Sequence, residues 1–254
     1  MAQPSDPKSV PIVLLSIAGF IVFWALLSIA KADPMVLPSP LAVAQIIGDE
    51  WTKGALQKHL WATLVRVAAA FGLAMVLGTV IGIVMGASKQ ADRWFGAWLV
   101  VFLNIPALVV IVLCYLWIGL NETAAITAVA LNKTAMVAVT IREGTRALDR
   151  RLWEMAHVFQ MPPVRRFVHV TLPQLWPYIA SSMRNGIAII WKIVLVVEFL
   201  GRSSGVGFKI HLYFQLFEIG HVLAYSVSFV AVMLLIEYTV ISSIERRATR
   251  WRSP

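Results

Sequence analysis

Long apolar stretches dominate the pattern of hydrophobic and polar positions along this 254-residue chain. A helix that crosses the hydrocarbon region of a bilayer needs about 20 mostly apolar residues. By this criterion we predict six transmembrane helices, at about residues 12–30, 60–85, 94–118, 123–141, 178–200 and 222–244. The pattern therefore predicts an all-α polytopic membrane protein, with residues 1–254 in a single transmembrane domain.

The first apolar stretch can be interpreted as a signal peptide or as an uncleaved transmembrane helix. Ala30-Lys31-Ala32 follows it and resembles the A-x-A cleavage site of a signal peptide. The apolar part of a signal peptide is usually about 7–15 residues long, and this stretch is longer. We therefore favour an uncleaved first span.

Composition supports a membrane protein. Hydrophobic residues make up 59% of the chain and charged residues 14%, whereas soluble domains average about 45–50% and about 25%. The net charge of +9 arises from Lys and Arg residues. Most of them lie in segments that the predicted spans place on the same side of the membrane as the N-terminus. Because such residues mark cytoplasmic loops, we predict that both termini are cytoplasmic and that the basic charge needs no nucleic acid.

Catalytic and metal-binding residue patterns are absent from the sequence. Cys114 is the only cysteine, and no two of the five histidines have the spacing that would place them together on a helix face. No nucleophile has a base and an orienting acid nearby. We predict no metal site, no disulfide within the chain and no enzymatic activity.

Two segments outside the spans have amphipathic patterns. After the break at Leu37-Pro38-Ser39-Pro40, apolar positions in residues 41–53 have helical spacing, which predicts a short helix on the outer surface. Residues 208–217, in the last outer loop, are rich in aromatic side chains. They fit either an interfacial helix or a surface for an external partner.

Two further patterns lie inside the spans. Gly78, Gly82 and Gly86 form a stripe of small residues that lets another helix approach closely. We favour packing within one chain over a contact between two chains. Asn104-Ile105-Pro106 predicts a kink in the third span, because proline lacks the N–H that a helix interior needs.

The segment 142–177, between the fourth and fifth spans, is the longest inner loop. Asp149 suits a helix N-cap, and the apolar residues after it predict a short helix that ends at Met161-Pro162-Pro163. A second short helix is expected at 164–171, ended by Leu172-Pro173. The two helices predict a docking structure for a cytoplasmic partner.

This loop resembles that of the permease subunits of bacterial ATP-binding-cassette importers. Their pattern is E-A-A, three residues, G, nine residues, then I-x-L-P. The chain has the same spacing, with Glu154-Met155-Ala156, Gln160 and Val170-Thr171-Leu172-Pro173 at the corresponding positions. Met155, Gln160 and Val170 depart from the pattern, and Gln160 replaces the glycine that permits the bend. We expect Pro162-Pro163 to bend the chain instead.

The resemblance extends over nearly the whole chain, and it points to the taurine, alkanesulfonate and nitrate branch of that family. The matching segments are residues 37–40, 59–72, 105–106, 116–119 and 201–207.

The resemblance implies an assembly in the bacterial inner membrane. Two permease chains, in this branch usually a homodimer, form a core of twelve spans, and a periplasmic or lipid-anchored binding protein delivers the solute. Two ATPase subunits bind ATP and Mg²⁺, so no cofactor is expected on this chain, which has no P-loop pattern. Closure of the ATP-bound ATPase dimer turns the permease from inward-facing to outward-facing. The implied ATPase-coupling residues are Glu154, Met155, Ala156, Gln160, Val170, Leu172 and Pro173.

Charged residues inside the spans are candidates for the transport path. Each costs about 2.5–3.5 kcal/mol at a helix centre unless it has a partner or faces water. Lys133 and Lys192 are the main candidates to line an aqueous path, together with Arg184 and Glu198. The alternative is an interhelical pair between either lysine and Glu198 or Glu237. Arg66 lies early in its span, and we expect it to reach outward to the interface.

A cationic lining favours an anionic cargo. The sequence thus predicts the permease subunit of an importer for a small anion such as a sulfonate, taurine or nitrate. The alternative is the same role for a neutral or cationic molecule such as a thiamine precursor. A membrane-embedded enzyme is disfavoured by the missing catalytic residues, and a stand-alone channel would not need the docking loop.

Overall fold

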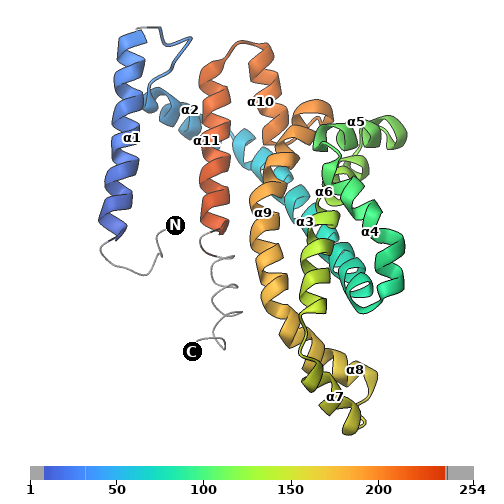
Figure 1. The fold of residues 1–254 in the computed structure, drawn as a ribbon. Helices are drawn as coiled ribbons and strands as arrows, with labels where there is room; N and C mark the ends of the chain where they lie inside the picture. Colours follow the sequence, from blue (N-terminus) through green and yellow to red (C-terminus); the bar gives the residue numbers. More distant parts are fainter. Residues whose placement is uncertain (1–8, 32, 238, 240–254) are drawn as a thin grey trace.

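The described part of the computed structural model comprises residues 9–31, 33–237 and 239. Within it the chain forms helices joined by short connections, without a strand (Figure 1). The predicted all-α class is therefore confirmed. The elements are α1 (Ser9–Lys31), α2 (Pro40–Thr52), α3 (Ala55–Ala87), α4 (Lys89–Asn104), α5 (Ala107–Ile118), α6 (Glu122–Arg146), α7 (Arg150–Val158), α8 (Pro163–Arg166), a π-helix (Phe167–Thr171), α9 (Leu172–Gly201), α10 (Val206–Gln215) and α11 (Ile219–Ile236).

Among the described residues, α3, α6 and α11 are long and apolar enough to cross a membrane. The pair α4 and α5 counts as a fourth span if the two helices are taken together. The described apolar part of α1 is shorter, and α9 is not among the candidates. Six spans therefore remain a prediction, of which the structure supports three or four.

The predicted third span is not one continuous helix. α4 and α5 meet at an angle of 98°, and the break lies at Ile105 and Pro106, where the kink was expected. Ile105 has extended backbone angles, and Pro106 has no N–H to continue the helical ladder. The position of the break is confirmed, and the bend makes the pair either a broken span or a re-entrant loop.

The glycine stripe of α3 packs against α6. A methyl group on Gly78 would lie 2.5 Å from the Cβ atom of Val137, and one on Gly82 would lie 2.6 Å from the carbonyl oxygen of Ala138. Real Cβ atoms do not approach so closely, so only glycine allows the two helix backbones to lie at this distance. The stripe serves packing within the chain, as favoured.

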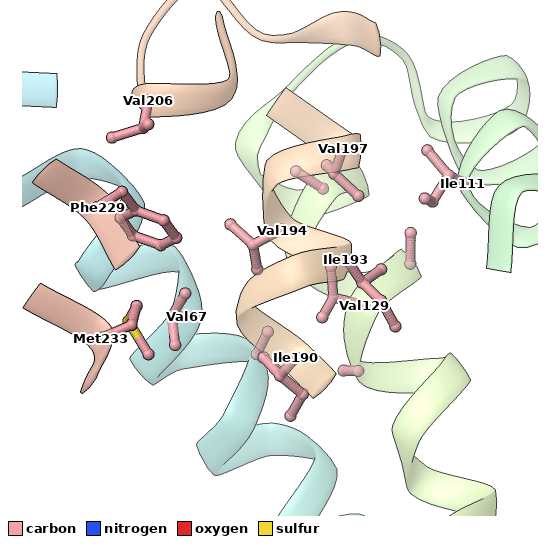
Figure 2. Close-up of a cluster of buried hydrophobic side chains, with 14 of the residues drawn as sticks. Val67, Ile111, Val129, Ile190, Ile193, Val194, Val197, Val206, Phe229 and Met233 are labelled. Carbon is pink, nitrogen blue, oxygen red and sulfur yellow. The ribbon is translucent and has the colours of Figure 1, made fainter. Parts of the chain in front are cut away.

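The core lies where α3, α6, α9 and α11 meet (Figure 2). Branched aliphatic side chains from α6 and α9 fill its centre, and Phe229 and Met233 of α11 close one side. α1 stands apart from this bundle and contacts it through α2 (Figure 1). Trp24 Nε1 donates a hydrogen bond to the Pro38 carbonyl oxygen at 3.1 Å, which ties α1 to the connection after it.

The short helix predicted for 41–53 exists as α2, and most of residues 208–217 lie in α10, so of the two alternatives left open there a helix is formed. Ser39 caps α2 by accepting a hydrogen bond from Ala42 N at 3.2 Å. Leu41 and Trp51 of α2 are exposed, whereas Glu50 is buried. Glu50 turns inward because its carboxylate accepts a hydrogen bond of 2.7 Å from the Tyr225 hydroxyl on α11.

Candidate functional site

The loop that resembles the importer motif forms one end of the molecule. α7 and α8 lie beyond the bundle, at the opposite end from α5 and α10 (Figure 1). Asp149 caps α7 as expected, since its Oδ1 accepts a hydrogen bond from Arg151 N at 2.8 Å. Asp149 N donates in turn to Gln174 Oε1 of α9 at 2.8 Å. The start of α7 is thereby fixed to the helix that enters the bundle.

α7 presents most of its side chains to solvent. Glu154 is exposed and forms an ion pair of 2.8 Å with Arg150, one turn earlier. Val158 and Phe159, at the end of the helix, are 77% and 75% exposed. Ala156, by contrast, is fully buried, which leaves no room for a larger side chain at the third position of the motif. The helix thus combines one buried small residue with an exposed face that is partly apolar and partly charged.

The bend after α7 occurs at Gln160 and not at the prolines. Gln160 has a φ of 50°, in the left-handed region. Gln160 N donates to the His157 carbonyl oxygen and Met161 N to that of Ala156, both at 2.9 Å, which is the Schellman ending of a helix. The expectation that Pro162-Pro163 replaces the missing glycine is therefore wrong. Gln160 itself adopts the conformation of glycine, at a cost of about 1–2 kcal/mol.

The predicted break at Leu172-Pro173 is also wrong. α8, the π-helix and α9 follow one another without interruption. Leu172 N donates to the carbonyl oxygen of Phe167, five residues back, which is the π-helical pattern. Pro173 lies in the first turn of α9 and Pro177 lies inside the same helix, so neither proline ends the helical stretch.

Several motif residues meet in a groove between α7 and the start of α9. The groove is lined by Leu152, Met155, His169, Val170, Pro173 and Gln174. Met155 is half-exposed and Val170 is buried. The two halves of the motif, far apart in the sequence, are thus adjacent in the fold.

The lysines of the candidate path lie on α6 and α9. Lys133 is 7% exposed, and its Nζ lies 4.0 Å from the sulfur of Met136. Within the described ranges, no carboxylate is at ion-pair distance from it. Lys192 is exposed, with its Nζ 5.4 Å from the ring centre of Trp191. Arg184 is exposed on α9.

Glu198 pairs with Arg66, not with a lysine. The side chain of Glu198 is fully buried and that of Arg66 is 5% exposed. The predicted pairing of Glu198 with Lys133 or Lys192 is therefore wrong, and so is the outward reach of Arg66. In this conformation Glu198 does not face water. Its burial inside the bundle requires a charged partner, and the guanidinium supplies it.

Glu122 and Arg202 complete this cluster, and sequence reasoning missed both. Glu122 accepts two hydrogen bonds of 2.7 Å from Arg66, and it accepts one of 2.6 Å from Arg202. The predicted spans contained the signal, because Arg66 and Glu198 lie near the predicted outer ends of spans 60–85 and 178–200, and Glu122 lies just before span 123–141 on that same side. Opposite charges at one depth are expected to pair.

Comparison with known proteins decides the family. Residues 74–251 match the family described as the inner membrane component of binding-protein-dependent transport systems. The chain belongs to this family. The relatives include the aliphatic sulfonates transport permease protein SsuC of Bacillus subtilis, 30% identical over 94% of this chain and 87% of the relative. The taurine transport system permease protein TauC of Escherichia coli is 24% identical over 91% of this chain and 85% of the relative.

Solved structures show the same fold. A chain of the MetNI methionine ABC transporter, in an inward-facing conformation, superposes with a TM-score of 0.67 at 17% identity. The match covers 79% of this chain and 99% of that one. The protein is thus a multi-pass inner-membrane permease of an ATP-binding-cassette importer. Hydrolysis of ATP in such importers resides on a separate chain, so the prediction of a transporter subunit without enzymatic activity is confirmed.

Proposed function

We propose that this chain forms half of the membrane path of an importer for a small anion, and that α7 docks an ATPase subunit. The second half is a further copy of the chain, and each copy engages one ATPase. A binding protein delivers the solute at the opposite end. The exposed apolar surface of α7 carries the proposal, because an apolar patch that faces water on a projecting element indicates a partner.

The charge of the α7 end supports its orientation. Four arginines lie on or beside α7 and α8, at positions 150, 151, 165 and 166. An excess of arginine and lysine near the ends of spans marks the cytoplasmic side. We therefore propose that α7 faces the cytoplasm, where the ATPase is found, and that both termini lie on that side.

Glu154 is the proposed polar contact to the ATPase. Within the described residues its ion-pair partner is Arg150 on the same helix, and both side chains are largely exposed. Such a pair is worth only about 0.3–0.5 kcal/mol. The carboxylate is therefore free to turn toward a basic group on another chain at little cost.

An anionic cargo is supported by Lys133. A buried cation that has no carboxylate at ion-pair distance among the described residues attracts a negative group and repels a positive one. The names of the relatives agree, since aliphatic sulfonates and taurine both carry a sulfonate group. We propose a sulfonate or similar small anion as the cargo, with Lys133 and Lys192 lining its path.

Co-purification tests the permease role. The tagged chain is expressed together with the ATPase and the binding protein of the same transport system, and the membrane fraction is purified in mild detergent. The proposal predicts that the ATPase is retained in a 1:1 ratio with the permease. A permease that elutes alone, although it is folded and inserted, would contradict the proposal.

The path lysines are tested by transport. We expect Lys133→Met and Lys192→Met each to lower uptake of the anion about tenfold, because the favourable charge on the path is lost. The control is Lys53→Met, an exposed lysine outside the bundle. ATPase retention should be unchanged in all three variants. Normal uptake in both path variants would assign the two lysines a structural role.

A further inference from the structure

The turn between α9 and α10 is held by an unusually complete set of hydrogen bonds to Arg66. The guanidinium has five N–H groups, and each has an acceptor. Two acceptors are the oxygens of Glu122 on α6, one is an oxygen of Glu198 on α9, and two belong to Ser204 in the turn. The Ser204 carbonyl oxygen lies at 2.8 Å and its hydroxyl oxygen at 2.7 Å. One side chain of α3 thus joins α6, α9 and the turn.

Side chains of α3 and α9 also fix the start of α10. Gly205, Val206 and Gly207 donate their N–H groups to His59 Nδ1 at 3.0 Å, Thr63 Oγ1 at 2.8 Å and Glu198 Oε2 at 2.9 Å. These are the N–H groups that a helix start leaves without partners inside the helix. The turn and α10 are therefore bound to α3 and α9 by buried polar contacts.

The contacts of the cluster with α6 are more exposed than its contacts with α9. Glu198 is fully buried, but the side chain of Glu122 is 49% exposed. Glu122 is shared between Arg66 and Arg202, and Arg202 Nε is buried without a hydrogen-bond partner. Water can thus reach one side of the cluster and exchange with its contacts, whereas the other side is sealed. The contacts of Glu122 on α6 with Arg66 and Arg202 are therefore the weakest of the cluster.

Apolar side chains pack closely around Arg66 between α3, α6 and α9. They include Ala125 and Val129 of α6 and Val194 and Val197 of α9, and they leave no room for a water molecule. Figure 2 shows Val197, Val194 and Val129 together in this region of the core. Separation of Glu122 from the two arginines would expose these side chains to water from the end opposite α7.

We propose that Arg66, Glu122 and Arg202 form the latch of an outer gate, which holds the end opposite α7 closed until ATP drives the outward-facing state. Arg66 is a positioning residue, because it keeps the turn against α3 and α9 while Glu122 separates. This inference rests on the proposed function, which makes that end the outer one. The latch sets how readily the outer end opens, and it is independent of which anion is carried.

A single-cysteine reporter tests the latch. Cys114 is replaced by alanine, and Val197→Cys places the only thiol beneath the cluster, where the valine is 1% exposed. The full complex in proteoliposomes is treated from outside with a membrane-impermeant maleimide. Glu122→Gln, which removes the charge but keeps the size of the side chain, is expected to raise the labelling rate about tenfold. It should also raise ATP hydrolysis in the absence of cargo, because the outward-facing state then forms more readily.

The control variant is Asp92→Asn at the opposite end of the bundle. Asp92 of α4 also binds two arginines, Arg142 and Arg146 of α6, and its loss should change neither labelling nor basal ATP hydrolysis. Unchanged labelling in Glu122→Gln, with a folded complex that retains its ATPase, would overturn the latch without touching the proposed function. A fall in ATP hydrolysis with increased labelling would indicate structural damage and would also overturn it.

The double variant Arg66→Met with Glu198→Leu keeps the test decisive if Glu122→Gln does not fold. Because it replaces the buried pair by apolar side chains of similar size, it is expected to fold. It should increase labelling at least as much as Glu122→Gln, since the turn loses its anchor. Slow labelling in this folded variant would equally overturn the proposal.

Discussion

The Glu154–Arg150 pair of α7 and the Glu198–Arg66 pair of the bundle are the same chemical interaction in two environments. The side chains of the first pair are 55% and 89% exposed, and those of the second are 0% and 5% exposed. In water a pair of opposite charges contributes little to the stability of the fold, because solvent competes for both ions. Inside the bundle neither ion can be left alone, because its desolvation would not be compensated.

The difference assigns distinct tasks to the two ends of the molecule. The α7 end can exchange its contacts for those of another protein, which is what a docking element requires. The opposite end holds three helices and a turn in one arrangement, and it releases them only where Glu122 meets water. Exposure, and not the type of residue, therefore separates the docking site from the proposed latch.

The largest expected effect is the loss of one partner of the buried pair. Arg66→Met leaves Glu198 buried without a counter-ion, and we expect it to destabilise the folded protein by about 3–5 kcal/mol. Arg150→Met, which breaks the exposed pair, is expected to change the free energy of unfolding by at most about 0.5 kcal/mol. Both are measured by unfolding in mixed micelles, followed by tryptophan fluorescence. Equal effects would refute the distinction drawn between the two pairs.

A smaller effect is expected from Glu154→Lys. This reversal should weaken ATPase binding about tenfold, or about 1.4 kcal/mol, while insertion and stability stay unchanged. Glu143→Lys is a matched control, because Glu143 on α6 is 53% exposed and also pairs with nearby arginines. The measurement is the amount of ATPase retained on each purified variant. Equal retention on the wild type and on Glu154→Lys would remove Glu154 from the coupling contact.

The smallest effect is a gain of stability at the turn after α7. Gln160→Gly should stabilise the turn by about 1 kcal/mol, because glycine adopts the left-handed conformation without the steric cost that glutamine has. The gain is measured as the change in the unfolding midpoint, with ATPase retention as a second readout. Destabilisation by this change would mean that the Gln160 side chain makes a contact whose value exceeds the cost of its backbone conformation.

The helices were predictable from the sequence because lipid-facing and buried positions are both apolar, so long apolar stretches stand out. The helix start at Asp149 was equally clear, because a short polar side chain there precedes an apolar run. Prolines were the main source of error. Pro106 breaks a helix, but Pro173 and Pro177 do not, and the π-helix before α9 has no recognisable signal in the residues that form it.

The motif in the loop located the docking element, but not its conformation. The left-handed Gln160 could not be read from residue type, because glutamine rarely adopts it. The partner of Glu198 was missed for another reason. Spacing along one helix cannot show which of several cations on other helices lies at the same depth, and only the packing of α3 against α9 selects Arg66. Charged residues within spans are therefore better compared by depth than by sequence distance.

Cargo-stimulated ATP hydrolysis tests the central claim of an anion importer most directly. The chain is reconstituted in liposomes with its ATPase and binding protein, and hydrolysis is measured with taurine, alkanesulfonates, nitrate, aromatic carboxylates and a thiamine precursor in turn. The account predicts stimulation by one class of anion, and a much weaker stimulation in Lys133→Met. Stimulation by the neutral or cationic compound alone would contradict the anion path.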